Sequence, residues 1–563
     1  MKKWGKSFLL IFLSVVLVLA MSSISCKTTK TETSETSAVS SAESTAASET
    51  TKAQESTVSA GPVTGGTLTY GIDYDVQRLD PLNTTWMTDA TMQLYDRMTA
   101  QDPTTGKIIP NLAESWEISD DGLIWTFHLR KGVKFHDGSP VNADAVKKFF
   151  DMARSSKTFA FSFHYTAIDS IEVKDENTVI FKLSHPDAHL LIAMQTVYSS
   201  IVNPEAYTKY GQDYGTTAVD GSGAFKFKEW VPGDHLTIVR NDAYNWPLSF
   251  FKNTGAPYLD EVIYKYIPDA TTRAVELETG NIDIVVGISP VDVERLSKVN
   301  TITIKETPKF SERYLAFNLE SKVWSDINLR KAVWYAIDRD AIVQAVLLGH
   351  GSPAYGYITP NMQGYYKDSD KAYPYDIEKA KELIKQAGWV DTNNDGIVEK
   401  NGKDLEAVYY SDSETEYKQL SEVLQQQLAN VGIKLVVNLV DAPTHQGAAK
   451  EGKHDIILMH WDWTDPEIAG LLMLSGNKPW PNASRINDPK IDKFFTDAGN
   501  AKSLEERNQI FSDMQKYAIE NIVPWVGLYI PNLIYGFSNN VKGYEPNPYD
   551  SLYPYLNDTY KIK

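Results

Sequence analysis

The stretch DEVIYKYIPDATTRAVELETGNIDIVVGIS, residues 260–289, switches twice between the period of a strand and that of a helix. Residues 261–267 are bulky on both faces, as in a strand covered on both sides of a parallel sheet. Asp269 can cap a helix, Gly280 can end it, and residues 282–286 form a second apolar run. The stretch therefore predicts a strand–helix–strand unit with a right-handed crossover between parallel strands.

The same alternation returns in residues 325–524. Helical patterns there are followed by apolar runs, and the alternating residues 433–439 after Gly432 read as a strand. Ser503 and Glu506 have the spacing of a capping box. The other predicted helix caps are Ser325 or Asp326, and Asp376. These changes of period predict an α/β fold.

Residues 114–153 do not alternate between strand and helix patterns as the two regions above do. Two alternating strands flank Asp121-Gly122, and a helix capped by Asn142 follows with an apolar stripe. The segment KDENTVIFKLSHP, starting at Lys174, adds another pair of strands. We predict an α+β domain inserted into the α/β fold.

Composition narrows the class of protein. The chain has 563 residues, which suggests two to four domains, and its 42% hydrophobic and 23% charged residues are ordinary for a globular protein. The formal net charge is −18 and no Lys/Arg stripe is present, which argues against nucleic-acid binding. With one cysteine, an internal disulfide framework or a thiolate-rich zinc site is excluded.

The N-terminus has the pattern of a secretion signal. Three lysines among residues 1–6 precede an apolar core at residues 8–21 and a small-residue stretch that ends at Cys26. The core is shorter than the roughly 20 residues of a membrane-spanning helix. The junction resembles the lipobox of bacterial lipoproteins, which implies lipidation of Cys26; the alternative is an ordinary cleaved signal with a stray thiol. Residues 27–62, rich in Ser, Thr and Glu, predict a disordered tether.

Five ordered blocks resemble the extracellular solute-binding proteins of the oligopeptide, dipeptide and nickel class, family 5, which serve ABC importers. The resemblance covers nearly all of residues 65–563. The blocks are AESWEISDDGLIWTFHLRKGVKFHDGSPVNADAV from Ala113, GSGAFKFKEWVPGDHLTIVRNDAYNW from Gly221, ETGNID from Glu278, LRKAVWYAIDRDAIVQAVLLGHG from Leu329, and RINDPKIDKFF from Arg485.

The resemblance implies a two-lobed, periplasmic-binding-protein-like α/β fold with an inserted α+β domain, which traps a ligand when a hinge closes. The expected domains are a signal at 1–26, a tether at 27–62, a first lobe at 63–105, 222–313 and 525–563, an inserted domain at 106–221, and a second lobe at 314–524. It further implies a monomer outside the cytoplasmic membrane, held there by its lipid anchor, with an ABC permease and ATPase subunits as partners.

Candidate ligand contacts lie in HDIILMHWDWTDPEIAG, residues 454–470. Its apolar first half predicts a central strand of the second lobe, and ligands in open α/β sheets bind beyond the carboxyl ends of strands. In peptide-binding members of the family, an aspartate three residues before an Asp-Pro or Glu-Pro pair holds the ligand's α-ammonium, and Asp462 matches that position. Trp461 and Trp463 are candidate contacts beside it, and Trp86 is a weaker one.

Other interpretations of these residues stay open. Trp461 and Trp463 can pack against helices, Asp462 can cap a helix near Pro466, and Trp86 can be a packing residue. The ligand can be a di- or oligopeptide, an oligosaccharide or a metal chelate. The chain lacks the sequence signatures of a serine hydrolase elbow, a zinc protease helix or a phosphate-binding loop, so we expect no enzyme. A sensory or adhesion protein that reuses the fold is a further alternative.

The loop DTNNDGIVE, residues 391–399, resembles part of a calcium loop. Asp391, Asn393 and Asp395 stand at positions 1, 3 and 5 of an EF-hand, but Gly402 stands where the bidentate glutamate belongs. We name these three residues as candidate ligands of a structural calcium ion and expect no other cofactor. The alternative is a polar turn that leads into a hairpin with Asn401-Gly402 at its tip.

Overall fold

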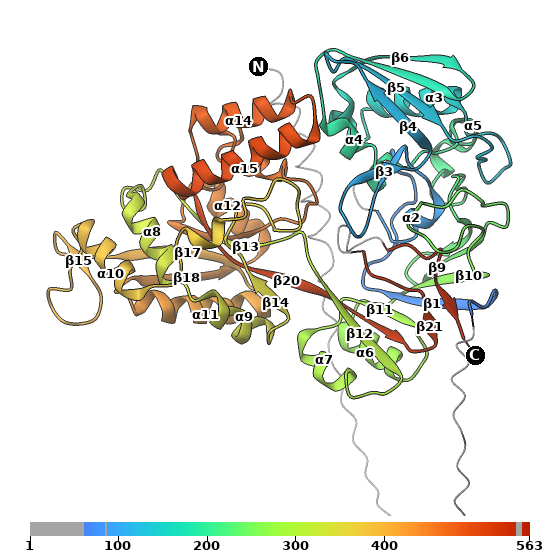
Figure 1. The fold of residues 1–563 in the computed structure, drawn as a ribbon. Coiled ribbons are helices and arrows are strands. Elements are labelled where there is room, and N and C mark those ends of the chain that lie inside the picture. The colour runs from blue at the N-terminus through green and yellow to red at the C-terminus, as the bar shows by residue number, and fades with distance from the viewer. Residues whose placement is uncertain (1–60, 85–86, 548–553, 563) are drawn as a thin grey trace, which may run out of the picture. The chain divides into compact units, whose positions relative to one another are not determined.

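The computed structural model describes residues 61–84, 87–547 and 554–562, and within these twelve strands pair into one sheet (Figure 1). This sheet lies in the compact unit Thr64–Lys563. The main path of the sheet runs β18-β17-β19-β13-β20-β11-β1-β10-β9-β8, and β12 and β14 also pair with β20. The strands are β1 (Thr67–Ile72), β8 (Phe225–Val231), β9 (His235–Arg240), β10 (Glu261–Tyr266), β11 (Ile284–Val286), β12 (Ile302–Pro308), β13 (Arg313–Phe317), β14 (Gly351–Pro353), β17 (Glu406–Asp412), β18 (Lys434–Val440), β19 (Ile456–His460) and β20 (Trp525–Ser538).

The predicted strand–helix–strand unit is confirmed. Strand β10 leads to helix α6 (Ala270–Glu278), whose first turn is capped where the Thr272 amide donates to Asp269 Oδ1 over 2.8 Å. Gly280 follows the helix at φ 77°, a conformation that favours glycine, and the chain then enters β11. Strand β1 lies between β10 and β11 and is parallel to both.

The region 314–524 holds the other half of the sheet and most of the helices. The cap of α8 is Asp326, one of the two predicted residues, and Asp376 and Ser503 cap α10 and α15 as predicted. Helix α11 packs on β17 and β18, and α12 packs on β17. The helices are α8 (Ile327–Ala336), α9 (Arg339–Leu347), α10 (Ile377–Gln386), α11 (Thr415–Ala429), α12 (Ala442–Glu451), α13 (Ile468–Met473), α14 (Pro489–Gly499) and α15 (Leu504–Asn521).

The predicted α+β segment forms a separate four-stranded antiparallel sheet in the order β4-β5-β7-β6. Helix α3 (Ala143–Ser155) packs on β6 and β7 and buries Val146, Phe149, Phe150 and Ala153, the predicted stripe. Asn142 Oδ1 accepts the Ala145 amide and caps the helix. The strands are β4 (Ala113–Ile118), β5 (Ile124–Leu129), β6 (Ile168–Asp175) and β7 (Thr178–Leu183).

Strand β20 joins the two halves of the large sheet, as Figure 1 shows. Residues 525–529 pair with β13, whereas residues 532–538 pair with β12 and, at residues 535–537, also with β11. The chain passes between the same two halves a second time at residues 309–312, between β12 and β13. The family resemblance implies that residues 525–563 belong to the first lobe, whereas residues 525–529 pair with β13 of the region 314–524.

The remaining elements are short. They are helices α2 (Thr91–Leu94), α4 (His189–Ala193), α5 (Pro204–Tyr210) and α7 (Pro290–Leu296), 3₁₀ turns η1 (Ser162–Tyr165), η2 (Val197–Ser199), η3 (Gly211–Asp213), η4 (Ser369–Lys371) and η5 (Ser475–Asn477), and strands β2 (Thr99–Gln101), β3 (Ile108–Pro110), β15 (Glu399–Lys400), β16 (Lys403–Asp404), β21 (Val541–Lys542) and β22 (Tyr560–Lys561). Among the described residues no helix has the length and apolar character to span a membrane. The predicted signal, Cys26, all but the last two residues of the tether, and Trp86 lie outside the described residues.

Candidate functional site

Strand β19 is central in its half of the sheet, as its apolar sequence predicts. It lies between β17, which is parallel to it, and β13, which is antiparallel, and four of its five residues are buried. The chain leaves the sheet after His460, so residues 461–467, which we call the β19 loop, begin at the carboxyl end of this strand. This is the edge at which open α/β sheets bind ligands.

Asp465 holds the β19 loop in place from within. It is 5% exposed, and its two carboxylate oxygens accept hydrogen bonds from Arg507 of α15 over 3.0 and 2.5 Å. Its Oδ1 also accepts the amide of Glu467, directly before α13. Burial alone would raise the pKa of Asp465, but the charge of Arg507 and these hydrogen bonds together lower it. The residue is an ionised structural anchor.

Asp462, three residues earlier, has the opposite environment. Its side chain is 58% exposed, and the ring of His460, 4.0 Å away, is the one ion-pair partner found for it among the described residues. Burial lowers the pKa of His460 to about 4, so this imidazole is neutral at pH 7 and does not neutralise the carboxylate. Nor does Asp462 cap α13, because the amide at that helix start binds Asp465.

The two tryptophans beside Asp462 are half-buried and point to different neighbours. The Trp461 ring lies 6.0 Å from that of Trp480. Trp463 donates its amide to the Phe310 carbonyl over 3.1 Å, and its ring lies 6.0 Å from that of Phe161 in the α+β segment. Each indole therefore packs in part, as the packing alternative predicts, and each remains partly exposed.

Glu312 is a buried carboxyl group that sequence analysis did not single out. It precedes β13 and lines a cavity of about 20 Å³, large enough for one water molecule, together with Trp461, Tyr314 and Tyr357. Its Oε1 accepts the Trp525 indole N–H over 3.2 Å, and Oε2 has no partner among the described residues. Burial raises the pKa of Glu312 to about 8, so the group is mostly protonated at pH 7. A charged residue directly before a fully buried strand was the available signal.

The loop at residues 391–399 brings Asp391, Asp395 and Glu399 together, with carboxylate oxygens within 4.8 Å of one another. Backbone amides already occupy these oxygens: Asp391 accepts those of Asn394 and Gly396. Further amides bind Asp395, Asn393 and Glu399. The predicted hairpin is present, because Asn401 and Gly402 have φ of 55° and 70° between β15 and β16. Calcium binding at Asp391, Asn393 and Asp395 stays a prediction.

A family model and several curated proteins match most of the chain. The model of bacterial extracellular solute-binding proteins, family 5 Middle, matches residues 107–481. The oligopeptide-binding protein AppA of Bacillus subtilis (strain 168) is 30% identical over 566 residues, with 97% of each chain covered. The glutathione-binding protein GsiB of Escherichia coli (strain K12) is 29% identical over 445 residues, 77% of this chain and 82% of that one.

Solved structures agree in fold. AppA from Bacillus subtilis in complex with a nonapeptide superposes with a TM-score of 0.67 at 28% identity, covering 89% of this chain and 100% of that one. The ABC transporter-associated periplasmic binding protein DppA from Helicobacter pylori, in complex with the peptide STSA, gives 0.66 at 25% identity, covering 89% and 99%. The predicted two-lobed α/β fold is thereby confirmed. The chain belongs to the family 5 bacterial extracellular solute-binding proteins.

Proposed function

We propose that this solute-binding protein captures a di- or oligopeptide between its two lobes and that Asp462 binds the peptide's α-ammonium group. The observation that carries the proposal is the exposed carboxylate of Asp462 just beyond the carboxyl end of the central strand β19. An ammonium group gives such a carboxylate a short charge-assisted hydrogen bond, and closure of the lobes strengthens it by excluding water.

The half-buried indoles of Trp461 and Trp463 supply apolar surface beside that charge. Flat aromatic faces accept peptide side chains of varied shape without demanding one sequence. The same faces suit the C–H surfaces of sugars, so an oligosaccharide is the second candidate ligand. The two ligands differ in their need for Asp462, since a neutral sugar has no ammonium group.

Relatives support the peptide. AppA and DppA carry peptides in their solved structures, and DppA is an ABC transporter-associated protein. We propose that the protein acts in the same way as a receptor, delivers its ligand to an ABC permease and leaves the ligand's covalent bonds unchanged. ATP hydrolysis then belongs to other subunits of the importer.

Closure requires a ligand that touches both lobes, because only differential binding shifts a conformational equilibrium. The two crossings, β20 and residues 309–312, are the hinge in this proposal. The segment 27–62 serves as a tether, and Cys26 as the lipid attachment that holds the protein on the outer face of the membrane or in the periplasm.

The test is isothermal titration of the purified protein with unmodified di- to nonapeptides and with neutral oligosaccharides. We expect peptide binding to give a heat signal in the titration and to raise the Tm of the protein in a separate thermal denaturation. Asp370→Asn is the matched control for Asp462→Asn, because Asp370 is an exposed aspartate of the region 314–524 that is not part of the β19 loop. Binding of an oligosaccharide that is insensitive to Asp462→Asn, with no response to any peptide, would move the assignment to the second candidate.

A further inference from the structure

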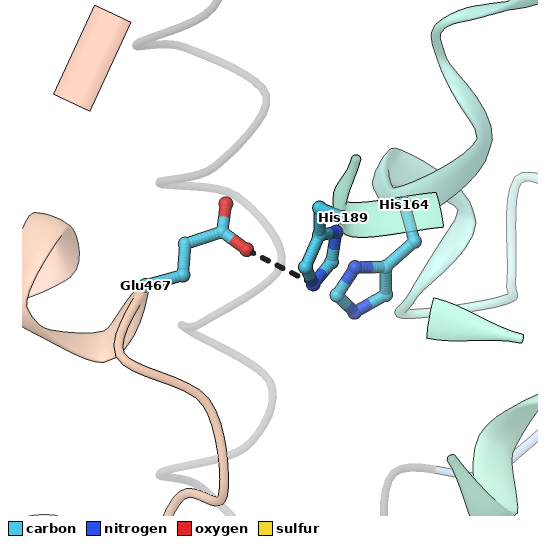
Figure 2. A group of neighbouring side chains, drawn as sticks. All are labelled: His164, His189 and Glu467. Carbon is cyan, nitrogen blue, oxygen red and sulfur yellow. Dashed lines mark ion pairs between the residues drawn. The ribbon is translucent and has the colours of Figure 1, made fainter. Parts of the chain in front are cut away.

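Two histidines and a glutamate from distant parts of the chain meet where the inserted α+β segment contacts the second lobe. His164 lies in η1, His189 is the first residue of α4, and Glu467 precedes α13. Figure 2 shows the two imidazole rings side by side, with the Glu467 carboxylate directed at His189. One ligand atom from each residue lies within 4.8 Å of the others.

Packing holds both imidazoles in place. The His164 ring stacks on Phe161 at 6.0 Å with an interplanar angle of 8°, and lies 4.8 Å from the His189 ring. His164 and His189 are 8% and 9% exposed. A neutral imidazole keeps the lone pair that binds metal ions.

Hydrogen bonding among the described residues leaves this cluster incomplete. His164 Nδ1 is buried and has no partner among them. His189 Nε2 and Glu467 Oε2 are 3.4 Å apart, beyond the usual 2.7–3.2 Å of such a hydrogen bond. Around a tetrahedral zinc ion with bonds of about 2.1 Å, two ligand atoms are about 3.4 Å apart. The His189–Glu467 spacing therefore fits two ligands of one metal ion better than it fits a direct bond.

We propose that His164, His189 and Glu467 bind one divalent transition-metal ion of the zinc, nickel or cobalt type. Two imidazoles and a carboxylate are ligands that these borderline ions prefer, whereas calcium and magnesium need oxygen ligands throughout. Three protein ligands leave a fourth tetrahedral position for water. The small spread of the ligand atoms requires side-chain adjustment and no change of fold.

The surrounding charge is compatible with a cation. Arg507 lies close enough to influence the titration of both histidines and Glu467. Asp465 accepts hydrogen bonds from both terminal nitrogens of Arg507 and so offsets its charge. Glu467 Oε2 lies 3.4 Å from His189 Nε2 and supplies the acidic ligand of the set.

Such an ion would join two regions of the molecule. Glu467 comes from the second lobe and the histidines from the inserted segment, whose Ala188 amide also donates to the Ala501 carbonyl over 3.1 Å. Because the ion binds a state in which these regions touch, it would stabilise that state by linkage. This last step rests on the proposed function, since only a closing receptor turns that contact into higher affinity for its solute.

The site itself is tested without any solute. Metal-free protein is titrated with ZnCl₂, NiCl₂ and CoCl₂, with the visible absorption of Co²⁺ as a report on the ligand set. We expect one high-affinity ion per chain, and binding weakened at least about 100-fold in His164→Ala, His189→Ala and Glu467→Gln. Even the loss of a residue that only hydrogen-bonds to a metal ligand costs about 10- to 100-fold in affinity. Glu467 is partly exposed, so its variant keeps the test valid if a histidine variant unfolds.

His128→Ala is the matched control, because His128 is a surface histidine of the same α+β segment that lies outside the cluster. Equal zinc affinity in wild type, His189→Ala and Glu467→Gln would overturn the proposal. So would loss of binding in Asp391→Asn, which would move the ion to the acidic loop. The bridging step is wrong if zinc binds but leaves peptide affinity unchanged, whereas zinc binding without any peptide binding contradicts the proposed function alone.

Discussion

Two acidic loops in the region 314–524 use their carboxylates in different ways. In the β19 loop, Asp465 is buried against Arg507, which fixes the backbone, while Asp462 is left facing solvent. In the loop at residues 391–399, the carboxylates of Asp391 and Asp395 bind amides of their own loop. A carboxylate is available to a ligand only when something else holds its loop in shape.

The largest effect is expected from breaking the anchor of the β19 loop. Asp465→Asn leaves the guanidinium of Arg507 buried without its counter-charge, and loss of one partner of a buried pair costs about 3–5 kcal/mol. Urea denaturation measures this free energy of unfolding. Asp462→Asn, the same change in the same loop, should stay within about 0.5 kcal/mol of wild type, because its side chain is exposed. An equal loss of unfolding free energy in the two variants would contradict the assignment of Asp465 as the anchor of the loop and Asp462 as a residue free to bind ligand.

Glu312 is a buried carboxyl group that has no ion-pair partner like Arg507 among the described residues, and it should make the stability of the protein depend on pH. The pKa of Glu312 rises from 4.5 to about 8 on folding, so between these values the folded state binds more protons than the unfolded state. Its contribution to stability is therefore present below pH 4.5 and is lost as pH rises towards 8, by about 1.4 kcal/mol per pH unit.

Wild type should thus lose roughly 3 kcal/mol relative to Glu312→Gln between about pH 5.5 and about pH 7.5. Denaturation of the two proteins at both pH values measures the difference. A constant gap between them would mean that Glu312 titrates normally in the folded state.

The smallest effect is expected in the loop at residues 391–399, where Asp391 accepts hydrogen bonds from amides of its own loop. Asp391→Asn weakens exposed hydrogen bonds to two amides and should cost less than about 1 kcal/mol. Millimolar Ca²⁺ should scarcely raise the Tm of wild type, because amides occupy the oxygens that the ion needs. A clear Ca²⁺-dependent rise that Asp391→Asn abolishes would establish the calcium site predicted at Asp391, Asn393 and Asp395.

Local features of the fold were predictable because nearby residues determine them. The caps at Asp269 and Asn142, the turn at Asn401-Gly402 and the central place of β19 each follow from residues within one element. The family resemblance supplied the two lobes, which periodicity alone does not specify. Asp462 was identified in the same way, from its spacing to Asp465-Pro466.

Contacts between distant residues were beyond sequence reasoning. Asp465 and Arg507 are 42 residues apart, and Glu467 meets two histidines that precede it by more than 270 residues. The environment of Glu312 depends on Trp525, more than 200 residues later. Strand β20 pairs with both halves of the sheet, which no pattern within its own residues indicates.

The central claim, that Asp462 holds an α-ammonium group, is tested most directly by titrating wild type and Asp462→Asn with one peptide in free and N-acetylated forms. A hydrogen bond between charged groups is worth about 1.5–3 kcal/mol, so wild type should prefer the free amine by roughly 10- to 150-fold, and Asp462→Asn should lose that preference. Equal affinity of wild type for both peptides, or an unchanged preference in the variant, would contradict the account.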